Sequence, residues 1–205
     1  MTGVAFEMLM HACHCYRQDM TGDTVPVLIG DRPALDLVNT GRLGPDADLL
    51  ATPPTAEAWV RAMAAHLTDV PLGTDLAVDS VRLDDLRLVR GAVAQVLQGR
   101  PRASSLAVVN RFDTEAAPSW TLDLGPDGAP VALRRVWGSG VDALLGLVAA
   151  DCVAMVRGGL LDEIAECASP GCQLRFLRGH HRRRFCRPDC AHRTRQAAYQ
   201  RRQTQ

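Results

Sequence analysis

Apolar residues recur at intervals of three and four over several stretches of this chain, which is the spacing of amphipathic helices. The longest stretch lies near 80–98, where one helical face collects the apolar residues Leu83, Leu86, Val89, Val93, Val96 and Leu97. A second helix is predicted from Thr55, as its cap, to about Leu67. Shorter helices are predicted near 103–111 and from Ala34 to Thr40.

The segment near 140–157 differs because it is apolar almost all round rather than on one face. Ser139 precedes it and Asp142 follows three residues later, an arrangement that fits a loose capping box. Gly158-Gly159 ends the pattern. A helix that is apolar on all sides must be buried, so we expect this segment at the centre of a helical domain.

Strand patterns are short in this sequence. Val27–Ile29 is an apolar run that Gly30-Asp31 ends, and we expect a strand and a turn there. Ser119–Leu124 and Pro130–Val136 flank the turn Gly125-Pro126-Asp127-Gly128, which predicts a β-hairpin.

These patterns divide the chain into three parts. Residues 1–24 show no period and are expected to be a weakly structured extension, and Met20 is an alternative start. A mainly helical domain that contains the β-hairpin is predicted over 25–159. A small module that ends in a helix is predicted over 160–205. The predicted fold class is therefore α+β.

Charge divides the chain unevenly. Its 205 residues carry 23 basic residues, all arginine, and 23 acidic residues, so the formal net charge is zero. Residues 167–205 hold ten arginines and one acidic residue, a net charge of +9, which leaves −9 on the rest. This asymmetry indicates a basic module that meets a polyanion. It also raises the hypothesis that the acidic part masks the basic module until a ligand or partner intervenes.

Four of the seven cysteines form two close pairs near the C-terminus. They are spaced Cys-x4-Cys-x13-Cys-x3-Cys at Cys167, Cys172, Cys186 and Cys190. Two short pairs joined by a loop are what a tetrahedral zinc site requires. Four thiolates leave no open position on the ion, so the predicted Zn²⁺ is structural rather than catalytic. A disulfide pair or four unrelated thiols are the alternatives, and the lack of a secretory signal argues against disulfides.

Arginines surround these cysteines, and a helix is expected after the last one. Arginine forks bind phosphates and pair bidentately with guanine. The predicted nucleic-acid contacts, with DNA as the expected partner, are Arg182, Arg183, Arg184, Arg193, Arg195, Arg201 and Arg202. The alternative is a solvated basic tail.

The C-terminal 40 residues resemble the CGNR zinc finger. That family has an aromatic residue, an Arg-Arg-aromatic-Cys element and Cys-Gly-Asn-Arg at the last ligand, and here Phe176, Arg183–Cys186 and Cys190–Arg193 occupy those places. Ala191-His192 replaces the Gly-Asn pair, and Phe185 replaces the usual tryptophan. The resemblance implies that the zinc site is kept and leaves the exact nucleic-acid preference open.

The preceding part is similar to the ABATE domain, which commonly precedes this finger. The similarity rests on Leu35-Asp36-Leu37-Val38-Asn39-Thr40 after a short strand and turn. Together the two resemblances cover about residues 26–203 and imply a bacterial, stress-induced transcription regulator. Asp36 and Asn39 are candidates for a ligand pocket; the alternative is that they cap a helix or bond buried backbone.

Several functions remain open from the sequence alone. The first is a DNA-binding regulator whose helical domain senses a small-molecule or protein effector or forms a homodimer. The second is a small-molecule-binding or enzymatic helical domain whose finger contacts protein or RNA. A third is redox sensing, in which oxidation of the thiolates ejects zinc.

Other classes of protein are not predicted. The sequence has no Gly-rich phosphate loop, nucleophile elbow or HExxH motif, so no enzyme is predicted. Its longest apolar run is too short and too charged to span a bilayer. We therefore expect a cytoplasmic protein that does not contact a membrane.

Overall fold

A computed structural model gives the structure of the chain over residues 16–18, 24–26, 28–43, 48–70 and 72–203. These residues form a mainly helical α+β fold, which confirms the predicted fold class. In chain order the described elements are β1 (Tyr16–Gln18), β2 (Thr24–Pro26), α2 (Pro33–Asn39), α3 (Pro53–His66), α4 (Ser80–Leu97), α5 (Ala103–Ala116), β3 (Ser119–Leu124), β4 (Pro130–Arg135), α6 (Gly140–Arg157), the short 3-10 helix η2 (Leu160–Glu163), β5 (Ile164–Glu166), β6 (Arg175–Leu177) and α7 (Pro188–Gln203).

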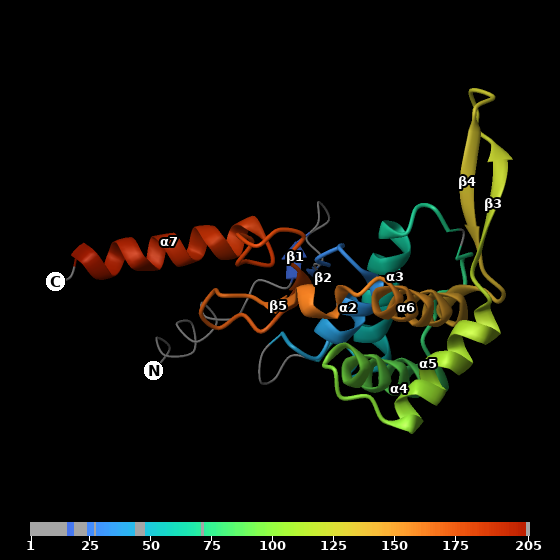
Figure 1. Cartoon of the computed structure of the whole chain (residues 1–205), viewed down its shortest axis with the longest axis horizontal. Coiled ribbons are helices and arrows are strands. Elements are labelled where there is room, and N and C mark those ends of the chain that lie inside the picture. Colours follow the sequence, from blue (N-terminus) through green and yellow to red (C-terminus); the bar gives the residue numbers. More distant parts are fainter. Residues whose placement is uncertain (1–15, 19–23, 27, 44–47, 71, 204–205) are drawn as a thin grey trace.

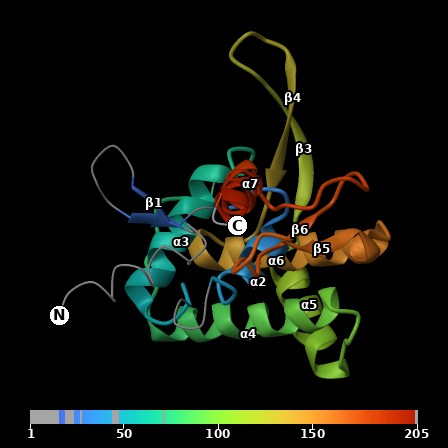
Figure 2. The same ribbon diagram turned by 90° about the vertical axis from the view of Figure 1, so that its left-hand side faces the viewer.

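Two features project from a cluster of helices (Figure 1). Helices α2 to α6 lie together, and the antiparallel β3–β4 hairpin extends from them. After the β5–β6 pair, α7 projects away from the helices. Figure 2 shows α7 end-on, and the hairpin again stands clear of the helices. No helix in the described part of the chain is long and apolar enough to cross a membrane.

Helix α6 lies at the centre of the helical cluster, as its sequence predicts. Eleven of its residues are buried, and it packs against α2, α3, α4 and α5. Its bounds match the predicted 140–157, but the predicted capping box does not form, because Ser139 makes no side-chain capping bond. Gly140 begins the helix with φ of +59°, and a Cβ there would lie 1.8 Å from the Asp75 carbonyl oxygen. Only glycine fits this close approach.

Helix α3 begins earlier than predicted. Its cap is Thr52, and Pro53 and Pro54 occupy the first helical positions, where proline has no N–H to leave unpaired. Thr55 lies in the first turn and its hydroxyl accepts the Thr52 N–H at 3.2 Å. Thr55 therefore belongs to a capping box and is not the cap itself.

Helix α2 is buried on every side. All its residues from Ala34 to Asn39 are buried. Its N-terminus has no side-chain cap of its own, and Asp151 of α6 supplies one by accepting the Ala34 N–H at 3.0 Å. Asp151 also forms an ion pair with Arg32 at 2.6 Å. Burial raises the pKa of Asp151, while the Ala34 N–H and Arg32 oppose this.

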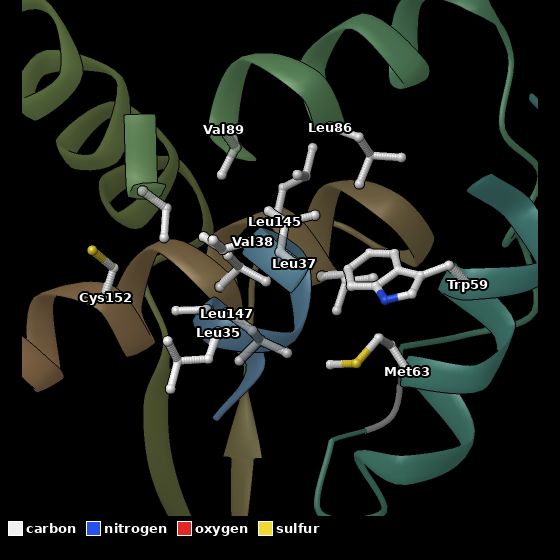
Figure 3. Packing of buried hydrophobic residues seen from close by; sticks show 14 of the residues in the cluster. Leu35, Leu37, Val38, Trp59, Met63, Leu86, Val89, Leu145, Leu147 and Cys152 are labelled. Carbon is white, nitrogen blue, oxygen red and sulfur yellow. The ribbon is translucent and has the colours of Figure 1, made fainter. Parts of the chain in front are cut away.

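The core forms where α2, α3, α4 and α6 meet (Figure 3). Trp59 and Met63 of α3 approach from one side, and Leu86 of α4 lies near them. Cys152 of α6 is 1% exposed, and burial raises the pKa of its thiol to about 12. As expected from the sequence, Cys152 is a buried apolar group.

The segment before α2 does not form the predicted strand at Val27–Ile29. Strand β2 ends at Pro26, and Leu28 and Ile29 lie outside any strand, while Val27 is not among the described residues. The N–H groups of Ile29 and Gly30 donate instead to the Asp36 carboxylate, at 2.8 Å and 3.0 Å. A side chain of α2 therefore fixes this segment, in place of a neighbouring strand.

The N-terminal region contains a strand pair that its sequence pattern does not predict. β1 pairs with β2 in an antiparallel arrangement, with Arg17 opposite Val25. The rest of the predicted weakly structured extension, including Met20, lies outside the described residues.

Helix α5 continues to Ala116, five residues beyond its predicted end, because its last turns pack on α6. A Cβ added to Gly146 of α6 would lie 1.9 Å from the Cβ of Ala116. The two helices therefore approach closely at this glycine.

We predict that Gly146→Ala lowers the free energy of unfolding by about 1–3 kcal/mol, because the added methyl overpacks the α5–α6 contact. Gly91→Ala in α4 is the matched control, since no atom lies within 4 Å of the position that a Cβ would take there. Alanine at that site favours the helix and raises the free energy by about 0.4–1 kcal/mol. Urea unfolding followed by circular dichroism measures both, and equal effects would contradict the close approach.

Candidate metal centre and nucleic-acid interface

The four C-terminal cysteines converge on one point. Cys167, Cys172, Cys186 and Cys190 are all buried, and their Sγ atoms lie within 4.8 Å of one another. Three of the Sγ–Sγ distances are 3.8 Å (172 to 186), 3.6 Å (186 to 190) and 3.9 Å (190 to 172). Tetrahedral zinc with Zn–S bonds of about 2.3 Å requires sulfurs about 3.8 Å apart. The cluster therefore has the geometry of a four-thiolate metal site.

The same distances argue against disulfides. A disulfide requires sulfurs about 2.05 Å apart, and all four cysteines are free thiols. The alternative of four unrelated buried thiols fails as well, because residues up to 23 positions apart converge on one point.

Backbone hydrogen bonds shape the two knuckles of the cluster. The first follows β5, where the Cys167 N–H donates to the Leu174 carbonyl at 3.0 Å and the Cys172 N–H to the Ser169 carbonyl at 3.0 Å. In the second, the Cys190 N–H donates to the Arg187 carbonyl at 3.2 Å, and α7 begins there. The Cys186 N–H points at the sulfur of Cys167, 3.5 Å away. This N–H stabilises negative charge on that sulfur.

Arg193 faces the cysteine cluster and not the solvent. Its guanidinium lies 3.5 Å from the Cys190 sulfur and 3.3 Å from the Ser169 hydroxyl. A cation beside a thiolate stabilises its charge. This side chain therefore supports the metal site, and the contact of Arg193 with nucleic acid stays a prediction.

Arg183 likewise serves the fold. Its guanidinium donates to the carbonyls of Leu177 and Cys186, each at 2.9 Å, and lies 4.7 Å from the centre of the Phe176 ring. It also forms an ion pair of 2.8 Å with Asp31 of the helical domain. The donors of Arg183 are used within the protein, and its contact with nucleic acid likewise stays a prediction.

The other predicted arginines are exposed. Arg182 and Arg184 lie in the loop before Cys186, and Arg195, Arg201 and Arg202 lie on α7. The structure therefore divides the seven predicted nucleic-acid contacts into two that face inward and five that face solvent.

The polar residues of the buried helix α2 bind backbone. Burial raises the pKa of Asp36 to about 6, although the N–H groups of Ile29 and Gly30 and the nearby His66 oppose this. Asn39 pairs with both backbone groups of Arg175 in β6: its amide donates to the carbonyl at 2.9 Å and its oxygen accepts the N–H at 2.8 Å. Both ends of these side chains are occupied by backbone groups, as the structural alternative expects, and a ligand pocket at Asp36 and Asn39 stays a prediction.

Sequence reasoning missed the residues that join the finger to the helical domain. Arg42 donates to the Gln173 carbonyl at 2.8 Å and pairs with Glu166 of β5. Asp31 forms the ion pair with Arg183, and Asn39 pairs with the backbone of Arg175. These partners lie more than 120 positions apart in the chain, and no local pattern links them.

The masking hypothesis gains no support from this arrangement. Helix α7 projects away from the acidic helical domain (Figures 1 and 2). Arg183, whose ion pair joins the finger to that domain, faces inward. The exposed arginines of α7 therefore stay accessible to a polyanion.

Comparison with known families agrees with this architecture. The C-terminal part, residues 163–203, matches the CGNR zinc finger, which identifies a zinc-finger protein. Residues 31–159 match ABATE, a family described as a "putative stress-induced transcription regulator". This match covers more than half of the chain, and the protein therefore belongs to the ABATE family. A search of curated proteins found no match.

We predict that Asn39→Ala lowers the free energy of unfolding by about 1–3 kcal/mol, because it leaves the backbone groups of Arg175 without partners. Hydrogen exchange at the Arg175 N–H should accelerate. Asn110→Ala, at an exposed site of α5, is the matched control and should change neither quantity. Unchanged exchange at Arg175 in the Asn39 variant would show that this pairing does not hold the finger.

Neighbouring arginines of the finger should respond differently to truncation. Arg183→Ala removes the ion pair with Asp31 and two charged hydrogen bonds, so we expect a loss of about 2–3 kcal/mol of stability. Arg182→Ala removes an exposed side chain and should change stability by less than about 0.5 kcal/mol. Thermal and urea unfolding of the zinc-loaded variants compare the two, and equal losses would contradict the inward role of Arg183.

Proposed function

We propose that this protein is a DNA-binding transcription regulator whose finger is held together by one structural zinc ion. The observation that carries this proposal is the exposed, arginine-rich helix α7, which begins directly at a buried four-cysteine cluster. A metal at this cluster fixes the start of a basic helix, and a fixed basic helix suits a negatively charged polymer.

Cys167, Cys172, Cys186 and Cys190 would hold the zinc. Four thiolates complete the coordination shell of the zinc. The ion therefore contributes to the free energy of folding and has no open coordination position for catalysis. The N–H of Cys186 and the guanidinium of Arg193 provide charge-stabilising contacts to the buried sulfurs, as such a site requires. Besides the cysteines, Leu174 and Phe176 are the fully buried apolar residues in the described part of the finger, and metal binding replaces a larger core.

The exposed arginines would contact the DNA backbone and bases. We assign this role to the five side chains that face solvent, Arg182, Arg184, Arg195, Arg201 and Arg202. If all five meet phosphates, the logarithm of the affinity falls with the logarithm of salt concentration at a slope of about −4 to −5. Arg183 and Arg193 act indirectly, because they hold the finger in shape.

The helical domain would receive the regulatory signal. We infer that it binds a small-molecule or protein effector or forms a homodimer, and that α2 transmits the change. This helix lies in the core, and its Asn39 holds β6 of the finger. A shift of α2 in the core would therefore move the finger relative to the helical domain.

Replacing one metal ligand tests the proposal. We predict that Cys186→Ser lowers the zinc content from one ion per chain towards none, unfolds the finger and reduces DNA affinity at least about 100-fold, because structural zinc supplies most of the folding energy of such modules. Zinc is measured by atomic spectroscopy, and binding by fluorescence anisotropy with a mixed-sequence duplex. A strong chelator added to the unmodified protein should reproduce the loss.

Cys152→Ala is the control for this experiment. This cysteine is buried in the helical core and does not join the cluster, so its replacement keeps the zinc and the DNA affinity. Full DNA binding by zinc-free Cys186→Ser protein would remove the finger from the mechanism.

A further inference from the structure

Helix α7 has an inner side that is tied to the finger. Cys190 and Thr194 are four residues apart and lie on the same side of the helix. The Thr194 hydroxyl contacts the buried Ser169 hydroxyl at 3.1 Å, and the Cys190 sulfur belongs to the metal cluster. Arg201 continues this line two turns further along. These contacts fix the rotation of α7 about its own axis.

The opposite side of α7 carries an unbroken stripe of polar side chains. With about 100° between successive residues, positions i, i+3, i+4, i+7 and i+10 share one face. We call these residues the outer stripe: His192, Arg195, Gln196, Tyr199 and Arg202. All five are exposed, and Tyr199 is 63% exposed.

The outer stripe differs from an ordinary solvated helix face. Solvated faces carry acids and bases in i,i+4 pairs, but α7 has no acidic residue after Asp189. Arg195 and Arg202 thus lack an intrahelical carboxylate partner at this spacing. An α-helix with this composition is only marginally stable alone in water, and a polyanion along the stripe would stabilise it.

The chemistry of the stripe favours bases over phosphates alone. Arginine pairs bidentately with the O6 and N7 atoms of guanine, and glutamine with N6 and N7 of adenine. Ten residues separate His192 from Arg202, a rise of about 15 Å. That length matches about four base pairs of duplex DNA, at about 3.4 Å each. The major groove is about 12 Å wide and admits an α-helix.

The position of α7 permits such an approach. The helix stands clear of the helical cluster, and the β3–β4 hairpin points in another direction (Figures 1 and 2). Arg182 and Arg184 lie in the exposed loop just before the second knuckle, near the start of α7. A helix in the groove would therefore leave these two arginines at the flanking phosphates.

We propose that α7 enters the major groove of duplex DNA and reads bases with its outer stripe. This proposal rests on the DNA-binding function proposed above and goes beyond it, because it assigns sequence recognition to named residues on one face. The inner side of α7 and its Arg201 do not face the bases in this arrangement.

Selection from a random duplex pool tests the proposal with zinc-loaded, full-length protein. The unmodified chain should enrich a motif of about four base pairs. Arg195→Ala and Gln196→Ala should each relax one position of that motif, with about a 10- to 100-fold loss of affinity for the preferred base. Arg201→Ala is the matched control: because its side chain lies away from the bases, it should keep the motif, and any loss of affinity should be equal for all sequences.

The outcomes separate this proposal from the function on which it rests. Zinc content and circular dichroism of each variant confirm that the finger remains folded. If all three variants keep the motif, the assignment of base recognition to the outer stripe is wrong, while the proposed DNA binding stands. Binding without any motif, or stronger competition by single-stranded RNA than by duplex DNA, would also overturn the proposal. No binding to any nucleic acid would overturn the proposed function itself.

Discussion

The pairing of Asn39 with the backbone of Arg175 holds the two parts of this protein together. Helix α2 is short and enclosed on all sides, so each polar side chain on it needs a partner inside the protein. Asp36 satisfies this requirement by binding the backbone that precedes the helix, and Asn39 by binding β6 of the finger. The core of the helical domain thus fixes the position of β6 of the finger. Arg42 and Asp31 add ion pairs around this central contact, but both lie nearer the solvent.

The finger uses its arginines in two ways, and this division explains how so small a module remains folded although its residues 167–205 carry a net charge of +9. Arg183 stacks on Phe176 and binds backbone carbonyls, while Arg193 compensates the charge of a thiolate. Both therefore use their positive charge to stabilise the finger around its cysteine cluster. The exposed arginines, among them Arg182, Arg184, Arg195, Arg201 and Arg202, carry excess charge outward, where a phosphate backbone can neutralise it.

Local patterns in the sequence predicted the features that depend on neighbouring residues. The bounds of α4 and the β3–β4 hairpin were confirmed, because helical periodicity and turn chemistry act over a few positions. The strand at Val27–Ile29 was wrong, since a carboxylate of α2 holds that segment and no second strand pairs with it there. The inward contacts of Arg183 and Arg193 were not predicted, for a related reason. An arginine side chain is expected to bind an anion or a carbonyl, but the sequence does not show which one. Asp31 lies 152 positions from Arg183, and only the fold brings them together.

The structure shows where the residues that depart from the CGNR pattern lie, relative to those that the chain keeps. Cys190 and Arg193 of that motif face inward, to the cluster, and the chain keeps both. The pair that differs, Ala191-His192, lies between them, and His192 is the first residue of the outer stripe. A change at an exposed position of α7 leaves the metal geometry untouched, because it removes no ligand and no contact of the inner side. The change at His192 therefore falls on the surface to which the proposal above assigns base recognition.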